Sequence, residues 1–332
     1  MKKIFAIIRS GEWWEYKLSP LLAIGYATSL STTTPLFQVA PHLLLILVAT
    51  AVGAMYVSVI NDITDMEEDL AAGKNNRMAK IPVNKRWIIP ACCAIIGILF
   101  LIFFFKDNLS RILYLLPWIS FSLYSFAPVR LKKRGLWGTL ADACGSHVFI
   151  SLLIIASVDS FTGSPLDWTW FFAFGIWSLF YGLRGILCHQ FTDRKHDLQI
   201  NLGTFATRTD PKSFSTISMI LFSIELFAFT FILFRISLFI VYFFLMLYFA
   251  LVLIRHKKWG QRTVLVVAPD NLPYQILMVD YYQSFFPISI LLYASLTQPN
   301  AWIVLLAHVI LFNATIRKAA WDFLMMIKPK MA

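Results

Sequence analysis

Two acidic segments carry the residue types and the spacing that could do chemistry. The first is NDITDMEED, from Asn61 to Asp69, and Asp62, Asp65 and Asp69 stand at i, i+3 and i+7 within it. A helix places these positions on one face, where three carboxylates repel one another unless a cation neutralises them. Hard oxygen ligands with room for water suit Mg²⁺, which usually shares itself with substrate phosphates. The segment therefore predicts a magnesium site for phosphate chemistry.

The second segment repeats this spacing. Gln190, Asp193 and Asp197 each lie 128 residues after their counterparts Asp62, Asp65 and Asp69. Taken alone, the first segment also fits a solvated acidic helix end balanced by nearby cations. A repeat in the same register favours metal-assisted phosphate chemistry instead, in a bundle of two pseudo-repeated halves whose acidic faces share one mouth.

The composition indicates the elements that must position these acids. The chain has 332 residues, of which 58% are hydrophobic, 16% aromatic and only 14% charged, and its mean hydropathy is +0.69. A soluble domain carries about a quarter charged residues, so a soluble enzyme, a disordered protein and a disulfide scaffold are all disfavoured. The four cysteines show neither metal-ligand nor disulfide spacing. We expect one all-α domain over residues 1–332, a polytopic transmembrane helical bundle.

Apolar runs of about 17–22 residues, long enough to cross roughly 30 Å of hydrocarbon, predict nine or ten spans. Of the 29 lysines and arginines, 25 fall in the termini, in the long connections 61–85, 127–137, 189–212 and 255–277, or at Arg86 directly after the first of these connections. This placement predicts a multi-pass protein of the inner (plasma) membrane with both termini and the active-site mouth cytoplasmic. We therefore interpret the net charge of +11 as contacting the membrane surface and not nucleic acid. No protein partner is predicted. The predicted spans are 18–37, 42–60, 86–105, 109–126, 138–158, 168–188, 213–234, 236–254, 278–296 and 301–317.

These motifs resemble those of the UbiA superfamily of intramembrane prenyltransferases. NDITDMEED is similar to the family's N-D-x-x-D-x-x-x-D pattern, and DRKHD, from Asp193 to Asp197, is similar to its second acidic motif. The stretch YSFAPVRLKKRG, from Tyr124 to Gly135, resembles the segment that follows the fourth span in some members. The resemblance covers about residues 10–300. Gln190 departs from it because the family has an acidic residue there, and Asn201 stands at a place where the family often has glycine.

The resemblance implies transfer of a prenyl group from a polyprenyl diphosphate to a membrane-associated acceptor, through an allylic carbocation and with Mg²⁺ as cofactor. The acceptor would be an aromatic compound, a quinone precursor or another lipid nucleophile. Asn61 would orient the acceptor or a carboxylate. The implied catalytic residues are Asn61, Asp62, Asp65, Asp193 and Asp197. Metal binding is implied for Asp62, Asp65, Asp69, Asp193 and Asp197, and substrate binding for Arg77, Tyr124, Arg130, Lys132 and Gln190.

Other polar and aromatic residues in or near the spans are weaker candidates. Arg184 is a candidate because ionisable residues inside membranes are costly, whereas Glu225 has no evident partner in the sequence, and Asp142 is expected to pair with an arginine of the 130–134 run. Lys133 and Arg134 are interpreted as membrane-anchoring cations. Aromatic residues that could stabilise a carbocation are Tyr56, Tyr124, Phe180 and Tyr181, and Tyr281 and Tyr282 are candidates at the interface.

Three alternatives stay open at this point. A protein of the same fold could cyclise a terpene without an acceptor, or transfer a phosphoribosyl group to a polyprenyl phosphate. An ion-coupled transporter would also carry intramembrane acids and repeats, although here the acids cluster at one interface. A non-catalytic membrane scaffold is the third alternative, because Gln190 interrupts the second acidic face.

Overall fold

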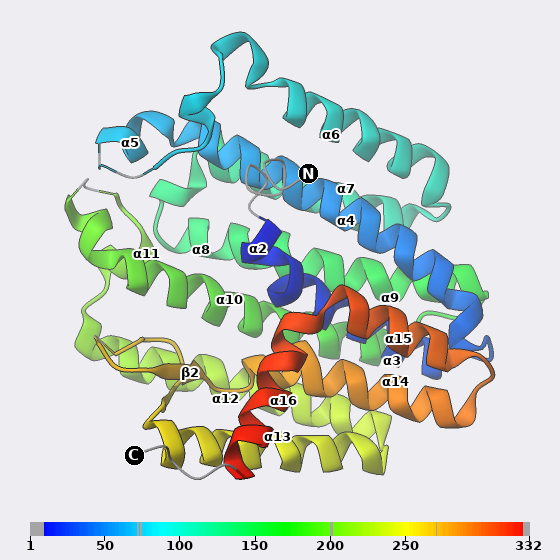
Figure 1. Ribbon diagram of the computed structural model, residues 1–332. Coiled ribbons are helices and arrows are strands. Elements are labelled where there is room, and N and C mark those ends of the chain that lie inside the picture. Colours follow the sequence, from blue (N-terminus) through cyan, green and yellow to red (C-terminus); the bar gives the residue numbers. More distant parts are fainter. Residues whose placement is uncertain (1–9, 72, 74, 200–201, 270, 328–332) are drawn as a thin grey trace.

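Long apolar helices run side by side through the molecule, as Figure 1 shows for a computed structural model of the chain. The structure describes residues 10–71, 73, 75–199, 202–269 and 271–327. The basic residues predicted at the extreme termini, together with Lys74 and Asn201, lie outside these described residues. Side chains of Ile24, Ile154, Phe174 and Ile290 are fully buried between α3, α9, α10 and α14, where the core lies.

The first half of the chain contributes two long helices and several bent ones. The bounds are α2 Ser10–Trp13, η1 Trp14–Leu18, α3 Ser19–Leu30, α4 Leu36–Thr64, α5 Met66–Ala71, η2 Met78–Lys80, η3 Val83–Lys85, α6 Ile88–Leu99, η4 Phe100–Phe104, α7 Asn108–Ser125, η5 Leu131–Lys133, α8 Leu136–Ala143, η6 Cys144–Val148 and α9 Phe149–Thr162. The segments η1, η4 and η6 are π-helical turns that continue their neighbouring α-helices.

The second half is built around α10, the longest helix of the described chain. Its bounds are α10 Trp168–Gln199, α11 Phe205–Arg208, α12 Pro211–Ile236, α13 Phe239–Trp259, β1 Arg262–Val264, β2 Tyr274–Ile276, η7 Tyr281–Phe285, α14 Phe286–Thr297, α15 Ala301–Leu311 and α16 Asn313–Ile327. Strands β1 and β2 form a short parallel ladder between α13 and η7. The all-α bundle that the sequence predicts is otherwise confirmed, and this short ladder is an addition to it.

Local sequence signals set several helix ends. The Asp107 side chain accepts a hydrogen bond of 2.7 Å from the Ser110 amide and so caps α7. Helix α9 ends at Gly163, whose φ of 69° is a left-handed conformation that glycine adopts without a steric penalty. The turn at Gly163 keeps the link between α9 and α10 short, so that the two helices are antiparallel neighbours.

The first two predicted spans have wrong boundaries. Helix α3 ends at Leu30, and α4 begins at Leu36 and runs through Pro41, so the predicted link at 38–41 is helical. Ser31 and Thr32 turn their hydroxyls back onto the carbonyls of Thr28 and Ser29. These bonds satisfy the last carbonyls of α3, and Pro35 then starts the next helix from an extended conformation.

Fewer helices than predicted are long and apolar enough to count as membrane spans. Six helical segments are long and apolar enough to cross a bilayer, and a seventh is counted if the bent pair α15 and α16 forms one span. That pair bends by 87° at Phe312, so α16 lies across the bundle and does not extend the predicted tenth span. Helices α3, α7 and α14, at three other predicted spans, run alongside the six in Figure 1.

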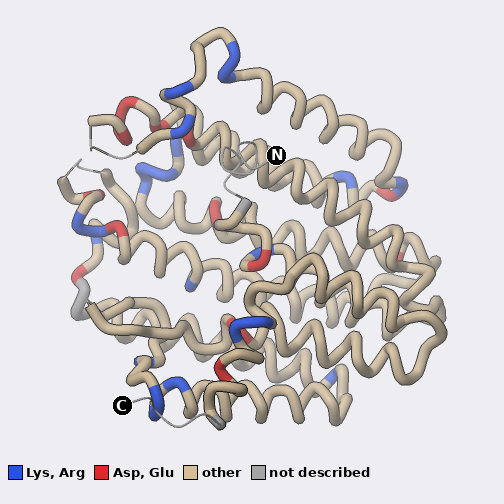
Figure 2. Tube along the Cα trace, viewed as in Figure 1, with Lys and Arg blue, Asp and Glu red and all other residues tan. Residues whose placement is uncertain are grey.

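Charged residues gather at the end of the bundle where α4 and α10 finish, on the left of Figure 2. Few charged residues lie at the opposite end, where the links between helices are short. The unequal distribution of charge that the sequence predicts is thus present in the fold, and the two acidic segments lie at the charged end.

Candidate active site

Both acidic segments line a single cavity of about 420 Å³, which we call the acidic cavity. Asp62, Asp65 and Asp69 come from one wall, and Asp193 and Asp197 come from the other. The convergence of the two segments at one entrance is the arrangement that the 128-residue repeat predicted. The other lining residues are Asn61, Glu68, Asn75, Arg77, Tyr124, Lys132, Ile186, His189, Gln190, Leu202 and Thr204.

The first wall is a helix that breaks where the motif begins. Helix α4 ends at Thr64, Asp65 is its C-cap with φ −101° and ψ −2°, and α5 starts at Met66. The prediction of one continuous helix face is therefore wrong. The amides of Asp65 and Asp69 still bond to carbonyls four residues earlier, at 2.9 and 2.8 Å, so the three carboxylates keep a helix-like spacing around the break.

Three cations from the connection after α7 hold Asp65 and Glu68 in place. Lys132 is bonded to Asp65, and Lys133 to Glu68. Arg130 donates to the Thr64 carbonyl at 2.9 Å and lies 2.9 Å from Glu68 Oε1, so it supports the wall from behind and is not among the residues that line the cavity. The interpretation of Lys133 as only a membrane anchor is wrong, because its ammonium group pairs with the motif.

The electrostatics of this wall follow from these pairs. Burial acts to raise the pKa of Glu68, but the hydrogen bond from Lys133 and the charges of Lys132 and Arg130 outweigh it and hold the pKa below its ordinary value. Burial lowers the pKa of Lys132, against the opposing charge of Asp65. The sequence analysis did not assign a role to Glu68. The only signal for one was its place inside the NDITDMEED motif, three residues after Asp65.

Asn76 is a functional residue that sequence reasoning missed. Its buried amide donates to the Asp69 carboxylate at 2.8 Å and to the Asp62 carbonyl at 2.7 Å, while its oxygen accepts from the Met78 amide at 2.9 Å. These bonds fold the chain after α5 back over the acidic cavity. As a result Arg77 lines the cavity, with its guanidinium 3.9 Å from Asp62.

The second wall is an uninterrupted helical face, as predicted. Asp193 and Asp197 both lie on α10, and Asp197 is buried with 5% of its surface exposed. The hydroxyl of Thr204 donates to Asp197 at 3.4 Å, and the Leu202 amide bonds to the Asp197 carbonyl at 2.8 Å. His189 reaches Asp193 at 3.9 Å from one turn earlier.

Gln190 lines the cavity but its amide is already used. The amide nitrogen donates to the Thr139 hydroxyl at 3.2 Å, and the amide oxygen accepts from the Ala206 backbone at 3.3 Å. Gln190 therefore joins α10 to α8 and α11. The two hydrogen bonds explain why Gln190 stands where the family motif has an acid. They require one donor and one acceptor on the same side chain, which an amide supplies and an ionised carboxylate does not.

A larger space of about 730 Å³, which we call the central chamber, lies next to the acidic cavity. Asn61, Tyr124, Ile186 and His189 line both spaces. The Ser125 hydroxyl donates to Asn61 and fixes its side chain at this boundary. Polar residues of the chamber come from many elements: Tyr16, Lys17, Ser58, Asp142, His147, Tyr181, Arg184, Thr192, Tyr274 and Gln283.

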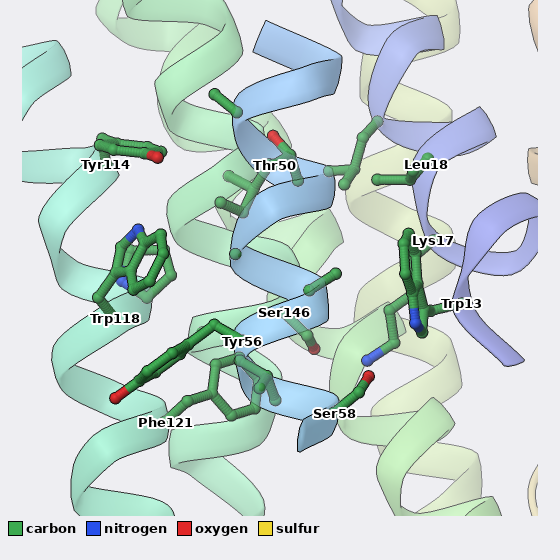
Figure 3. Close-up of a pocket in the computed structure, with 18 residues that line it drawn as sticks. Trp13, Lys17, Leu18, Thr50, Tyr56, Ser58, Tyr114, Trp118, Phe121 and Ser146 are labelled. Carbon is green, nitrogen blue, oxygen red and sulfur yellow. The ribbon is translucent and has the colours of Figure 1, made fainter. Parts of the chain in front are cut away.

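A narrower apolar space of about 110 Å³, the inner pocket, continues from the chamber between α3, α4, α7 and α9 (Figure 3). Figure 3 shows the rings of Trp13, Tyr56, Trp118 and Phe121 turned toward it. The two spaces share the lining residues Trp13, Lys17, Val57, Ser58 and Phe121. The acidic cavity, the central chamber and the inner pocket thus follow one another into the bundle.

Several other predicted residues take different places. Tyr124 and Tyr181 line the central chamber, and Tyr56 lines the inner pocket, whereas Phe180 lines none of the three spaces. Tyr281 and Tyr282 are fully buried, which contradicts their expected interfacial position. Asp142 faces the chamber and, among the described residues, forms no ion pair with the 130–134 run.

Arg184 and Glu225, which had no evident partner in the sequence, form a buried ion pair. Arg184 donates to both carboxylate oxygens of Glu225, at 2.5 and 2.8 Å, and also to the carbonyls of Leu265 and Leu277. Tyr282 donates to the same carboxylate at 3.0 Å. The pair therefore joins α10 to α12 and holds the β1–β2 segment against the chamber.

Comparison with known protein families identifies the family of this chain. A family model described as "UbiA prenyltransferase family" matches residues 18–270. The chain belongs to the UbiA prenyltransferase family. It is accordingly a multi-pass integral membrane protein and an enzyme of that family. A comparison with curated protein sequences gives no match.

Solved structures of UbiA homologues share the fold at low sequence identity. A UbiA homologue from Archaeoglobus fulgidus bound to DMAPP and Mg²⁺ superposes with a TM-score of 0.55 at 14% identity, covering 98% of this chain and 99% of the other. The same homologue bound to GPP and Mg²⁺ gives a TM-score of 0.55 at 13% identity with the same coverage. The agreement extends over nearly the whole length, so the UbiA fold here includes the C-terminal helices beyond residue 270.

The donor set of the acidic cavity suits magnesium shared with a phosphate ligand. Among the described residues, no three His, Cys, Asp or Glu side chains lie close enough together to enclose a metal ion by themselves. Mg²⁺ does not need such a cage, because it usually retains waters and binds one or two carboxylates together with substrate phosphates. Carboxylates on two facing walls, with space between them, meet that requirement.

Proposed function

We propose that this UbiA-family enzyme transfers a prenyl group from a polyprenyl diphosphate to a membrane-associated acceptor through an allylic carbocation. The observation that carries the proposal is the single acidic cavity bounded by both motifs and opening into an apolar interior. A polyprenyl diphosphate has the matching shape, with an anionic head and a long apolar tail. The head would lie in the acidic cavity, and the tail would extend through the chamber toward the inner pocket.

The head group would be held by residues on both walls. Asp62, Asp65, Asp69, Asp193 and Asp197 would bind Mg²⁺, which when bound stabilises the negative charge that develops on the leaving diphosphate. Arg77 and Lys132 line the cavity and can contact phosphate oxygens directly. Arg130 would act through Asp65 and Glu68, and Gln190 through its contacts with Thr139 and Ala206, so for both we now propose a positioning role.

The carbocation would form where the acidic cavity meets the chamber. Tyr124 and Asn61 lie at this boundary, so the phenol ring faces the region where the allylic C–O bond breaks. The apolar walls deeper in the bundle exclude water from the cation. Asn61 would orient the acceptor against the cation.

The finer features of the membrane arrangement remain part of the proposal. We propose that the chain crosses the membrane nine or ten times, in two pseudo-repeated halves. This number counts α3, α7 and α14 as spans, because they run alongside the longer helices in Figure 1. The acidic mouth and both termini would face the cytoplasm across the inner (plasma) membrane, because the charged end of the bundle carries the basic connections.

The test is transfer of label from a prenyl diphosphate by the purified protein. Full-length protein in nanodiscs would be incubated with Mg²⁺ and radiolabelled prenyl diphosphates of increasing length, with and without a membrane lipid extract. Prenylated product that needs the extract supports acceptor transfer, whereas product without the extract indicates cyclisation. Ion transport in liposomes without any cleavage of the diphosphate would overturn the proposal.

A further inference from the structure

A short backbone contact joins the two loops that flank the acidic cavity. The Gly135 amide, just before α8, donates to the Gly203 carbonyl at 2.9 Å, and Gly135 pairs with Thr204 in an isolated parallel β-bridge. Gly135 has φ 56° and ψ −116°, a conformation that favours glycine. We call this contact of Gly135, Gly203 and Thr204 the loop clasp. It ties the connection after α7 to the connection after α10.

The side chain of Arg208 lies across the loop clasp. Its guanidinium donates to the Lys133 carbonyl at 3.2 Å. A Cβ added at Gly203 would come within 2.6 Å of Arg208 Nη2, and one added at Gly135 within 3.4 Å of Arg208 Cδ. Arg208 therefore occupies the space that both glycines leave open. It is exposed and does not line the acidic cavity, so it acts on that cavity through the loop clasp.

Each side of the loop clasp supports one wall of the acidic cavity. Lys132, three residues before Gly135, is bonded to Asp65 on the first wall. On the other side, the Thr204 hydroxyl donates to Asp197 on the second wall at 3.4 Å. The loop clasp therefore connects an acid of one wall to an acid of the other.

The two walls need such a connection because their carboxylates face one cavity. Like charges repel, and this repulsion acts to widen the cavity when no cation is bound. Gln190 opposes the widening two turns before Asp197, where its amide bonds Thr139 and Ala206. The loop clasp is the second connection between the walls, and it lies beyond Asp197 along the chain.

We propose that Arg208 is a positioning residue that closes the loop clasp, holds the two acidic walls at a separation suited to a diphosphate, and so favours a diphosphate over a monophosphate ligand. The inference rests on the proposed prenyl transfer and adds to it a residue that sets head-group specificity. A diphosphate can contact both walls through its two phosphate groups, whereas a monophosphate contacts one wall at a time. When the loop clasp opens, the diphosphate loses one wall and the monophosphate keeps its contacts.

The first measurement is the separation of the walls in protein without Mg²⁺ or ligand. In a background without native cysteines, spin labels are attached at Glu67→Cys on α5 and Leu198→Cys on α10. Both positions are exposed and line none of the three spaces. Double electron–electron resonance on full-length protein in nanodiscs gives the distance between the labels. We expect Arg208→Ala to lengthen and broaden the distribution of this distance.

The second measurement is binding of two ligands in the presence of Mg²⁺, by isothermal titration calorimetry. The ligands are geranyl S-thiolodiphosphate, whose C–S bond resists cleavage, and geranyl monophosphate. Arg208→Ala should lower the ratio of diphosphate to monophosphate affinity by about tenfold, because a hydrogen bond from a charged donor is lost. The affinity for the monophosphate should stay within about twofold of wild type. Arg208→Lys should restore part of the ratio, since an ammonium group can donate to the same carbonyl.

Gly203→Ala tests the loop clasp from its other side. The added methyl group would displace Arg208 Nη2, so this variant should lower the affinity ratio as Arg208→Ala does. The double variant should lose no more than either single one, because both changes open the same contact. Arg134→Ala is the matched control, since Arg134 is exposed and donates to the Pro128 carbonyl at 3.2 Å within its own loop. It should leave both readouts unchanged.

An unchanged label distance or an unchanged affinity ratio in Arg208→Ala would overturn the inference. An equal loss of affinity for both ligands would also overturn it, because Arg208 would then serve the fold or contact phosphate directly. The same loss in Arg134→Ala would do so too, since it would reflect net charge alone. Wild-type protein that binds neither ligand would instead remove the proposed prenyl transfer, while the label distances would still decide whether the loop clasp holds the walls.

Discussion

Asp62 shows how a single residue combines burial with charge at this site. Only 5% of its surface is exposed, and the Arg77 guanidinium lies 3.9 Å from its carboxylate. Burying a carboxylate is costly unless nearby charge or hydrogen bonds compensate. The chain meets that cost with Arg77 and the surrounding polar cavity, so the position is built for a charged ligand and not for packing.

We expect Asp62→Asn to lower prenyl transfer by about 10³-fold, because the loss of one preorganised charged contact at a leaving group costs that order of rate. Glu67→Gln is the matched control, since Glu67 belongs to the same motif but is exposed and does not line the cavity. The measurement is turnover of radiolabelled prenyl diphosphate by equal amounts of folded protein. Equal losses in the two variants would contradict the assignment.

Asn76→Ala should raise the KM for the prenyl diphosphate by about tenfold or more, because two hydrogen bonds to the first wall are lost at about 1 kcal/mol each. Asn76→Asp should be worse than alanine, since a carboxylate cannot donate to Asp69 and repels it. Steady-state kinetics over a range of donor concentrations measures the change. Recovery of wild-type KM by the aspartate variant would show that Asn76 does not act through these bonds.

At the scale of elements, the bundle positions the site through helices that are interrupted near it. Helix α4 stops at Thr64 so that α5 can turn its acids toward the cations of η5. Helices α3, α9 and α14 each begin after a π-helical turn that borders the central chamber. Helix α10 differs, because it remains regular through the site and supplies the second wall as an unbroken face.

We expect the size of the inner pocket to limit the length of the prenyl chain that the enzyme can use. A Cβ added at Gly53 meets the Trp118 ring at 3.8 Å, an ordinary contact, so Gly53→Leu should be accommodated and fill the pocket. Transfer from a twenty-carbon donor should fall about tenfold, because the tail loses apolar contacts worth about 1–2 kcal/mol, whereas a ten-carbon donor should be used as before. Competition between the two donors measures this ratio.

Leu44→Phe is the matched control for that variant, since Leu44 lies on the same helix with its side chain facing outward. It should leave the ratio of long to short donors unchanged. An unchanged ratio for Gly53→Leu as well would show that the tail takes a different path.

At the scale of the whole molecule, a buried ion pair holds distant segments together. Arg184 is 2% exposed and Glu225 is fully buried, and their contacts join α10, α12, the β1–β2 segment and, through Tyr282, η7. A buried pair is held in place by the cost of leaving one charge alone, more than by its own net stability.

Arg184→Met should therefore lower the free energy of unfolding by about 3–5 kcal/mol, because Glu225 would be buried without its partner. The double variant with Glu225→Leu should recover most of that loss. Denaturant-induced unfolding in detergent, followed by circular dichroism, measures both. A double variant as unstable as the single one would place the main contribution in the bonds to the Leu265 and Leu277 carbonyls.

The charge distribution of the bundle predicts its orientation. In a background without native cysteines, Glu67→Cys lies at the charged end, and Thr297→Cys lies at the opposite end beside the link from α14 to α15. A membrane-impermeant maleimide added to intact cells should label position 297, and position 67 only after permeabilisation. The reverse pattern would contradict a cytoplasmic mouth.

The resemblance of the motifs predicted the family, and residue type and spacing in the sequence predicted the helical membrane fold and the pairing of the two acidic segments. The fold and the pairing depend on local periodicity: apolar runs must be helices in a bilayer, and acids at i, i+3 and i+7 keep a helix-like spacing even where the first helix breaks at Asp65. Helix boundaries near Ser31 and Phe312 were predicted wrongly, because they depend on competing backbone hydrogen bonds and on a bend that composition does not reveal.

Only the tertiary structure decided which residues support the acids and which face the interior. Asn76 reaches Asp69 through a loop, Lys133 reaches Glu68 across 65 residues, and Arg184 finds Glu225 on a neighbouring helix. Arg208 reaches the Lys133 carbonyl from a loop 75 residues away. Such contacts depend on distances between elements packed in three dimensions, and no regular spacing along the chain encodes them.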